Sequence, residues 1–559
     1  MRNEMKNRKT IPFAAAALAV AAACVFVCGQ REDFSLARNI ETVAAMMREI
    51  AVNYVDPVSA DRLMADAAEG MTSRLDPYTE YLSEEGMKQF EQAATGKYGG
   101  IGSVIRRQDD CVVISEPYKG SPADRAGLKA GDRIVAVDGE NTVGMSIEQV
   151  SSRLKGDPNT YVKVTVERIA DAQRVTHKIK RERITIPGIT YAGWAADGIG
   201  IIRHSDFTEG CYDDMRAAIE RLRSEGELKG LILDYRNNGG GFLQEAIKIL
   251  SLFVPKGSET VTVRGRDAAS QKIYATTLEP LLPDLPLALL VNGNTASSSE
   301  IVAGTLQDMD RAVLVGSKSF GKGLVQSTVP IGYGAFVKMT TAKYYIPSGR
   351  CIQNIDYSSH DDNIGEVPDS LIREFATRSG RKVYDGGGIM PDIRTEPEYI
   401  SRFALTLYAM GYIDEFCDSY VARHPDLEAD SVTFAITDGE YDDFVAFMQD
   451  RDVPYTSSTR YALERLRTAV ESDRYGDRIG GLLEQMERSL DDDRDSNLQT
   501  YRKQIAQTIE SGIVRRVNYG EGAVARELSQ SPEVAAAVEV LLDAGRYADI
   551  LANADTVKK

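Results

Sequence analysis

The sequence predicts a multidomain protein in which a β-rich domain precedes an α/β core, with helical segments on both sides. Three observations support this fold class. The chain has 559 residues, which is more than one hydrophobic core normally serves. Short β-rich runs separated by glycine-bearing turns occupy residues 97–183, whereas strands alternate with helices over residues 184–394. The segments before and after these regions show mainly helical periodicity.

The net charge of the chain limits the kinds of partner that it can bind. The formal net charge is −17, which argues against nucleic acid or anionic lipid as the main partner because both require concentrated positive charge. Protein and peptide substrates remain compatible with this charge. The cysteines beyond the N-terminal segment are scattered and predict free thiols rather than a disulfide framework or a zinc site. They are Cys111, Cys211, Cys351 and Cys417.

Residues 1–30 have the pattern of an export signal. Four basic residues between Arg2 and Lys9 precede an alanine-rich apolar run from Ile11 to Cys28. Cleavage, lipidation at Cys24 and retention as a membrane anchor all remain open, since the run is long for a signal core and at the lower limit for a membrane span. In each case the expected location is outside the cytoplasm, in the periplasm or cell envelope.

Residues 31–96 predict an N-terminal helical segment. Its first part carries an apolar stripe at helical spacing, made by Ile40, Val43, Ala44, Met47 and Ile50. A further helix is expected in "LDPYTEYLSEEGMKQF", with Ser83 as its N-cap.

Residues 97–183 contain the strand patterns "VVIS", "RIVAVDG" and "YVKVTVER", with a short helix predicted at "SIEQVSSRL". Together with "YGGIG" before the first strand and "GSPADRAGLKAGDRIVAVDG" in the middle, this order closely resembles a PDZ domain. The resemblance implies that backbone N–H groups of the glycine loop hold the C-terminal carboxylate of a peptide that adds as a strand to the domain edge. The loop comprises Tyr98, Gly99, Gly100, Ile101 and Gly102. A plain glycine turn is the alternative.

Residues 184–394 predict the α/β core. "GIGIIRHSDF", "LKGLILDYRNNGGG" and "LPLALLVNGNT" have the patterns of strands, and "CYDDMRAAIERLRSEG" that of an amphipathic helix. The second and third of these strands end at polar glycine turns, where active sites often lie.

A serine run, "NTASSSEIVAGTLQD", lies between a buried strand and a helix. The helix N-terminus can stabilise developing negative charge, but a serine nucleophile also needs a base. Of the histidines in the chain, only His204 falls in the core at a position suited to a Ser-His-Asp triad. For Ser298 and Ser299, helix capping is the structural alternative to a nucleophilic role.

A lysine is the better candidate for the base. Lys322 lies between two glycines in "SFGKGLVQ", where the chain can approach another backbone closely. Burial would lower its pKa from about 10.4 and let it accept a proton. Gln326, four residues later, can orient the amine. Taken alone, such a lysine is usually a surface residue.

The stretch "NGNTASSSEIVAGTLQDMDRAVLVGSKSFGKGLVQ" strongly resembles the catalytic stretch of the carboxyl-terminal processing proteases, peptidase family S41. "DPYTEYLSEEG", "LILDYRNNGGG", "TTAKYYIPSGR" and "GGGIMPDI" match the same family, so the resemblance covers about residues 38–393. It implies a PDZ domain inserted ahead of an α/β serine-peptidase core. It also implies a nucleophile, Ser297, and a general base, Lys322, which Gln326 orients.

The same resemblance implies that the oxyanion donors are backbone N–H groups of Ser298 and of Gly240 or Gly239, with Gly240 favoured. Thr295 and Ser298 depart from the serine and alanine usual in this family, which leaves Ser298 and Ser299 as rival nucleophiles on sequence grounds. A second departure is a polar insertion at about residues 354–386, in which "DSLIREFATRSG" predicts a short helix.

The prediction is therefore an exported, ATP-independent serine endopeptidase with a Ser-Lys dyad. It recognises free, apolar C-termini of protein or peptide substrates through its PDZ domain and hydrolyses peptide bonds through an acyl-enzyme. No metal and no organic cofactor are expected, and oligomerisation is open. Residues 395–559 predict a solvated helical accessory domain. The alternative is a non-catalytic PDZ-containing envelope scaffold.

Overall fold

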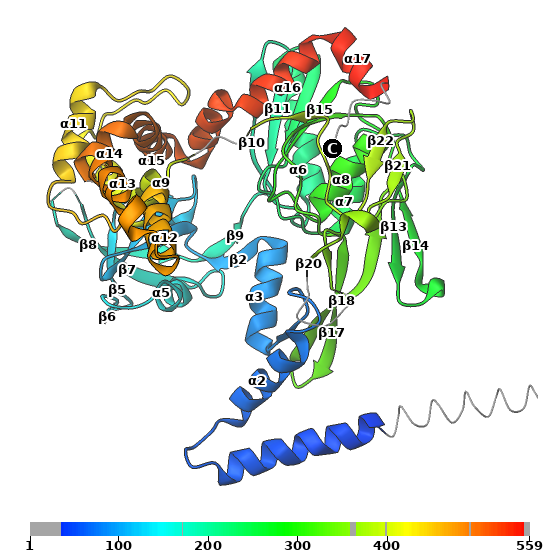
Figure 1. Ribbon diagram of the computed structural model, residues 1–559, viewed down its shortest axis with the longest axis horizontal. Coiled ribbons are helices and arrows are strands. Elements are labelled where there is room, and N and C mark those ends of the chain that lie inside the picture. Colours follow the sequence, from blue (N-terminus) through cyan, green and yellow to red (C-terminus); the bar gives the residue numbers. More distant parts are fainter. Residues whose placement is uncertain (1–34, 170, 358–364, 397–399, 491–493, 553–559) are drawn as a thin grey trace, which may run out of the picture. The chain divides into compact units, whose positions relative to one another are not determined.

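The computed structural model describes residues 35–169, 171–357, 365–396, 400–490 and 494–552 (Figure 1). The chain forms two compact units, of which the smaller includes residues 35–84 and 326–340. The predicted export signal over residues 1–30 lies outside the described residues. Within the described ranges, no helix is both long and apolar enough to cross a membrane.

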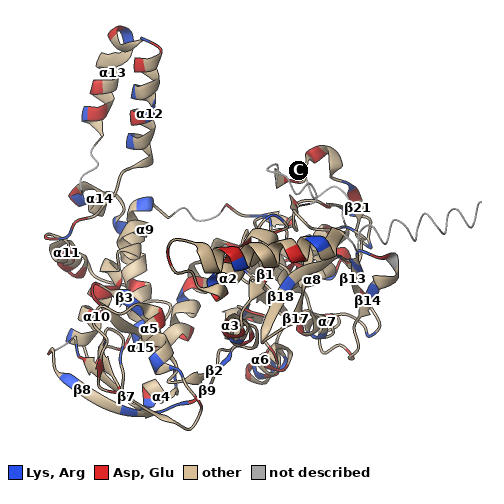
Figure 2. Ribbon diagram, turned by 90° about the horizontal axis from the view of Figure 1, so that it is seen from below, with Lys and Arg blue, Asp and Glu red and all other residues tan. Residues whose placement is uncertain are grey.

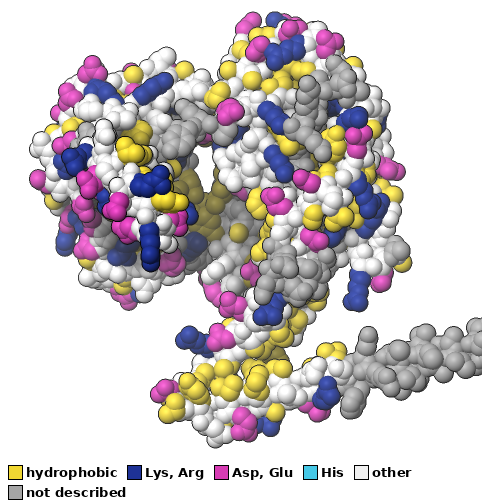
Figure 3. All heavy atoms as spheres, in the orientation of Figure 1, with side chains coloured by type: hydrophobic (Ala, Val, Ile, Leu, Met, Phe, Trp, Pro, Cys, Tyr) yellow, Lys and Arg dark blue, Asp and Glu magenta, His cyan; other side chains and the backbone are white. Residues whose placement is uncertain are grey.

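The smaller unit begins with a helix over residues 35–53, followed by α2 (Ala60–Thr72). The short strand β1 (Glu80–Leu82) pairs antiparallel with the first part of β18 (Ala335–Tyr345), which also pairs with β17 (Leu324–Gly332). The predicted stripe on the first helix is present but largely unburied, since Ile40 is 60% exposed and Val43 is 39% exposed. Apolar side chains are visible along this helix in Figure 3.

In the larger unit, the β-rich domain forms a sheet in the order β3-β4-β5-β7-β8, with β3 at one edge. The predicted short helix is α5, and Ser146 caps it by accepting the N–H of Gln149. Alternate residues of β7 are buried, because one face of this antiparallel sheet covers the domain core. The elements of this region are α3 (Glu84–Thr95), β2 (Lys97–Gly100), β3 (Ser103–Gln108), β4 (Cys111–Pro117), α4 (Pro122–Arg125), β5 (Arg133–Val137), β6 (Glu140–Asn141), α5 (Ile147–Leu154), β7 (Tyr161–Glu167), β8 (Arg174–Lys180) and β9 (Glu182–Thr185).

The α/β core is a sheet in the order β10-β11-β12-β15-β16-β23, in which only β10 runs antiparallel to its neighbour. Its strands are β10 (Ile189–Ala196), β11 (Ile199–His204), β12 (Gly230–Asp234), β15 (Leu287–Val291), β16 (Val313–Gly316) and β23 (Ile393–Arg394). One face packs against α6 (Cys211–Glu225), α7 (Leu243–Leu250) and α8 (Ser298–Asp308). Because the other face is also covered, the central parallel strands are continuously apolar, as the sequence indicated.

A second, smaller antiparallel layer borders the core. The strand β13 (Glu259–Gly265) pairs with the last part of β18 and with β14 (Lys272–Ala275). A short 3-10 turn, η1 (Ala268–Ser270), connects β13 and β14. The chain then returns to the site through the end of β18, which carries Tyr344.

The insertion differs from its prediction. The expected short helix over "DSLIREFATRSG" is wrong: a 3-10 turn, η2 (Asp369–Leu371), is followed by a hairpin of β21 (Glu374–Ala376) and β22 (Lys382–Tyr384). Arg381 explains the difference, because its buried guanidinium forms ion pairs with Asp310 and Asp392 of the core. These tertiary contacts override the local helical preference. Two further short strands, β19 (Ile355–Asp356) and β20 (Gly365–Glu366), pair with each other, and residues 358–364 lie outside the described ranges.

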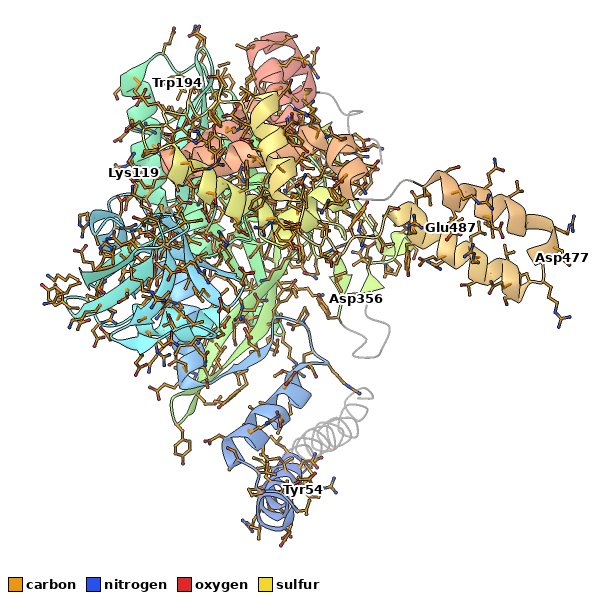
Figure 4. The ribbon with its side chains drawn as sticks, turned by 90° about the vertical axis from the view of Figure 1, so that its left-hand side faces the viewer. Tyr54, Lys119, Trp194, Asp356, Asp477 and Glu487 are labelled. Carbon is orange, nitrogen blue, oxygen red and sulfur yellow. The ribbon has the colours of Figure 1, made fainter. Side chains whose placement is uncertain are left out.

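The region after residue 400 is helical, as predicted, and has its own buried core. Its helices are α9 (Arg402–Ala409), α10 (Tyr412–Arg423), α11 (Asp438–Phe447), α12 (Ser458–Ser472), α13 (Gly476–Ser489), α14 (Arg494–Thr500), α15 (Arg502–Gln530), α16 (Pro532–Leu542) and α17 (Ala544–Ala552). The pair α12 and α13 forms a hairpin that carries acidic and basic residues along both helices (Figure 2). Asp477 and Glu487 mark α13 in Figure 4.

The end of this region is not a separate solvated domain. Val534, Ala537 and Val540 of α16 are buried against the second face of the core sheet. The preceding α15 is interrupted at Tyr519, which has φ 60° and ψ −172°. Its first half belongs to the helical core, and its second half leads to the sheet.

A buried charge cluster joins the β-rich domain to the helical region. Asp418 of α10 accepts from Arg106 of β3 at 2.5 Å and from Arg516 of α15 at 2.6 Å. Asp414 also accepts from Arg516. Nearby, the carboxylate of Glu116 in β4 accepts the N–H of Gly520 at 2.6 Å. The two regions are therefore connected by desolvated charges as well as by packing.

Candidate active site

Ser297 occupies the N-cap position of α8, directly after the loop that follows β15. Its backbone adopts φ 57° and ψ −118°, a conformation that costs free energy for a residue with a side chain. Residues that follow β12 fix this loop by hydrogen bonds. Thr295 donates its hydroxyl to the carbonyl of Tyr235, and Ala296 donates its N–H to the carbonyl of Asn238. The half-buried nucleophile candidate therefore stands on a turn fixed by the end of β12.

The hydroxyl groups of the two following serines donate hydrogen bonds to backbone carbonyls of the glycine turn region. Ser298 donates its hydroxyl to the carbonyl of Gly241 at 2.8 Å, and Ser299 donates to the carbonyl of Asn238 at 3.0 Å. Both side chains are buried. They tie the glycine turn to α8 instead of capping the helix, and this geometry favours Ser297 over its two rivals.

The glycine turn after β12 approaches the serine closely. A Cβ on Gly240 would lie 2.7 Å from Cβ of Ser297 and 2.9 Å from the nitrogen of Ser298, so this position accepts only glycine. The N–H of Gly240 already donates to Oδ1 of Asn238 at 2.9 Å and would have to exchange that acceptor for an oxyanion. The N–H of Ser298 lies in the first turn of α8, where N–H groups have no acceptor within the helix.

Lys322 lies in the loop between β16 and β17 and is half-buried. The glycines beside it have the packing role expected from the sequence. A Cβ on Gly321 would lie 2.5 Å from Cβ of Asn354, and one on Gly323 would lie 2.8 Å from the nitrogen of Gln353. The loop therefore packs directly against the neighbouring backbone.

Glu300 is a site residue that the sequence analysis did not single out. Its side chain is fully buried, and Oε2 accepts the N–H of Ser297 and the N–H of Lys322, each at 2.9 Å. Oε1 accepts the hydroxyl of Ser319 at 2.6 Å and the N–H of Gly321 at 2.8 Å. Burial raises the pKa of Glu300 to about 7, although these hydrogen bonds lower it. A glutamate three residues after an N-cap serine is the capping-box pattern, which could have identified it.

Tyr344 contacts the same two residues through their carbonyl groups. Its hydroxyl lies 3.1 Å from the carbonyl oxygen of Ser297 and also donates to that of Lys322. The ring is buried in the core, and the backbone N–H of Tyr344 donates to Gly323 at 3.0 Å. The sequence motif "TTAKYYIPSGR" contained this residue without indicating its role.

His204 is a core residue in this structure. It is fully buried between Phe207 and Tyr235, and its Nε2 lies 2.9 Å from the carbonyl oxygen of Asp206. Burial lowers its pKa to about 3, so the ring is neutral. These contacts give no support to a Ser-His-Asp triad.

Gln326 belongs to the smaller unit, where its Nε2 donates to the hydroxyl of Thr340 at 3.2 Å. Its predicted role in orienting the lysine stays a prediction.

The predicted peptide-binding loop is divided between two elements. Tyr98, Gly99 and Gly100 belong to β2, which pairs with β9, whereas Ile101 and Gly102 form the connection to β3. Gly102 has φ +75° and lies against Ser121. Of the predicted loop, only Ile101 and Gly102 therefore lie outside a strand, and its role in binding a carboxylate stays a prediction.

Comparison with known proteins places the chain in a family. Residues 198–361 match the sequence profile described as "Peptidase family S41". A carboxy-terminal-processing protease of Bartonella bacilliformis is 33% identical over 332 residues, which cover 59% of this chain and 74% of that relative. A probable CtpA-like serine protease of Staphylococcus aureus is 34% identical over 381 residues, covering 67% of this chain and 72% of the relative. The chain belongs to peptidase family S41.

The other regions of this S41 protease also match known domains. Residues 113–168 match "PDZ domain", and residues 403–541 match "Probable PDZ-protease, C-terminal helical domain". Among solved structures, one titled "photosystem II D1 C-terminal processing protease" is 28% identical with a TM-score of 0.35, covering 63% of this chain and 86% of that one. The predicted family and fold class are confirmed, and the protein is a serine-type protease of the carboxy-terminal-processing group.

All four cysteines in the described ranges are free, and three are buried. In the same ranges, no group of His, Cys, Asp and Glu side chains has the arrangement of a metal site.

Proposed function

We propose that this chain is an exported endopeptidase that cleaves through a Ser297–Lys322 dyad and an acyl-enzyme. The observation that carries the proposal is the shared anchor of the two residues: both backbone N–H groups donate to one oxygen of Glu300. Residues separated by 25 positions are thereby held at one place in the fold, as a nucleophile and its base must be.

In the proposed reaction, Oγ of Ser297 attacks the substrate carbonyl while the neutral amine of Lys322 accepts its proton. The N–H of Ser298 and that of Gly239 or Gly240 stabilise the oxyanion. The lysine then returns the proton to the leaving amine, and water hydrolyses the acyl-enzyme by the same proton transfers in reverse. Gln326 is included as the residue that orients the lysine.

The PDZ domain supports a peptide or protein substrate with a free C-terminus. The edge strand β3 lies beside α5, and Ile101 and Gly102 directly precede it. A peptide can add to this edge with its carboxylate at the connecting loop. Ile105 of β3 is partly buried against the same core as Val150 and Leu154 of α5, and this apolar side of the strand favours an apolar C-terminus.

Self-association is also part of the proposal. On the helix over residues 35–53, apolar side chains recur with the alternating spacing of four and three that makes a coiled-coil seam. The seam comprises Leu36, Ile40, Val43, Met47 and Ile50. Beside it lie Ala37, Ala44 and Ala51, one in each heptad, which permit close approach without charge repulsion. A second copy of the same helix fits this seam.

The test of the catalytic proposal is cleavage of a flexible protein with an apolar C-terminus by the purified parent, Ser297→Ala and Lys322→Ala. Both variants should stay folded by circular dichroism and lose cleavage. Lys318→Ala is the matched control, since this exposed lysine lies in the same loop. Cleavage by folded Ser297→Ala at the parent rate would refute the nucleophile assignment.

The same purified parent protein also tests the alternative, that the chain is a non-catalytic scaffold. A parent protein that binds a C-terminal peptide but cuts no substrate would favour the scaffold. Fractionation of cells producing the full chain tests export: the protein should be found in the periplasmic or membrane fraction, and recovery in the cytoplasm would contradict it.

A further inference from the structure

Two buried side chains outside the predicted catalytic set each contact both Ser297 and Lys322. Glu300 accepts the two backbone N–H groups, and the Tyr344 hydroxyl faces the two backbone carbonyl oxygens. We propose that Glu300 and Tyr344 are positioning residues that clamp the backbone of the nucleophile to that of the base. This inference rests on the proposed dyad.

The carboxylate side of the clamp is rigid. Both N–H groups donate to the same oxygen, so the two backbones are held within reach of a single atom. The other oxygen is fixed by Ser319 and Gly321, which prevents the carboxylate from rotating. Because Glu300 lies in the first turn of α8, it also moves with the helix that carries the serine.

The tyrosine side of the clamp comes from a different element. Tyr344 lies on β18, its ring is only 1% exposed, and its backbone N–H donates to Gly323, next to the lysine. Its hydroxyl has one hydrogen, which can serve the carbonyl of Ser297 or that of Lys322 at one time. The tyrosine thus links the strand, the lysine loop and the serine turn.

Ser297, the residue that the clamp contacts from both sides, has a strained backbone conformation. Ser297 has positive φ, and such a conformation persists only where its surroundings fix it. Its N–H and its C=O are the two groups that Glu300 and Tyr344 contact. Removing either contact lets the turn relax and moves Oγ relative to the amine of Lys322.

Neither residue is assigned a contact with substrate, so the clamp should act on the chemical step and not on binding. Displacement of reacting groups by about 1 Å can lower a rate by about 100-fold. We therefore expect kcat to fall by about 10- to 100-fold in a clamp variant, with KM unchanged.

The experiment compares Glu300→Gln and Tyr344→Phe with two matched controls. Glu300→Gln keeps the shape but directs an NH₂ group at N–H donors, and Tyr344→Phe removes only the hydroxyl. Glu245→Gln alters another buried carboxylate that accepts a backbone N–H, from Tyr212. Tyr441→Phe removes another buried hydroxyl that donates to a backbone carbonyl, that of Leu498. For each, kcat, KM, the single-turnover acylation rate and the melting temperature are measured.

The clamp is supported if both site variants lose kcat and acylation rate with KM unchanged, while the controls change only in melting temperature. Parent kcat in a folded clamp variant, or an equal loss of kcat in the controls, overturns it. If Glu300→Gln fails to fold, Tyr344→Phe decides alone, because its ring packing is retained. Failure of the proposed function is recognised separately, by an inactive parent or an active Ser297→Ala.

Discussion

At the scale of single residues, the side chain of Glu300 is completely buried and accepts four hydrogen bonds. The donors are the N–H groups of Ser297, Gly321 and Lys322 and the hydroxyl of Ser319. An ionised carboxylate can accept from all four, whereas a protonated one turns an acceptor into a donor. The protonation state of this side chain therefore bears directly on the geometry of the site.

Activity should consequently fall as the pH decreases through about 7, the value to which burial raises the pKa of Glu300. The active form is the ionised one, so this limb lies on the acid side. Glutamine at position 300 does not titrate in this range. The Glu300→Gln variant should therefore have a lower kcat than the parent, and its kcat should not fall further as the pH decreases through about 7. Profiles of kcat against pH for the parent and the variant check this, and an identical acid limb in both would contradict it.

The same pKa shift acts on stability in the opposite direction. Between the ordinary pKa of 4.5 and about 7, folded Glu300 holds a proton that the unfolded chain has released. Ionisation of this group therefore lowers the free energy of unfolding as the pH rises through that window. Activity lost on acidification cannot then be attributed to unfolding caused by Glu300.

At the scale of secondary-structure elements, the exposed seam on the helix over residues 35–53 leads to a test of assembly. Substituting Glu for both Ile40 and Val43 places charges in the seam, so the assembly should dissociate to a lower mass. Sedimentation or light scattering measures the mass, and circular dichroism checks the fold. Arg38→Ala, on the opposite side of this helix, is the control. Equal masses for the parent and the double variant would exclude the seam as the interface.

The elements also show what sequence patterns can specify. The strands of the core and the α5 helix were predictable because apolar runs, turn glycines and the Ser146 cap are local signals. The hairpin in the insertion was not, since Arg381 within it forms ion pairs with Asp310, which is distant in sequence, and with Asp392. For the site, the motif supplied the serine, the lysine and the glycine turn. The contacts of Glu300 and Tyr344 with both Ser297 and Lys322 arise only when the two loops and β18 are brought together.

At the scale of the whole molecule, the buried charges between the PDZ domain and the helical domain are a cooperative link. Burial raises the pKa of Asp418, while Arg516 and Arg106 lower it, so desolvation and attraction are in competition. Such a cluster adds little net stability when complete, but it is costly to break, because the remaining charges stay buried.

Asp418→Asn should therefore reduce the free energy of unfolding by about 3–5 kcal/mol, as expected when one partner of a buried ion pair is removed. Urea denaturation of the parent and the variant measures the difference. Glu279→Gln is the control, because its 3.7 Å pair with Lys256 is exposed and should contribute about 0–1 kcal/mol. An unchanged midpoint in Asp418→Asn would show that the cluster does not link the domains.

The position of α16 has a consequence for biosynthesis. Until residues 532–542 have left the ribosome, the face of the core sheet that α16 covers keeps apolar side chains exposed, including Ile201, Ile232 and Leu290. A nascent chain can therefore form the PDZ domain before this face is covered, because residues 97–183 are synthesised first. The core sheet completes its packing only after α16 has been translated.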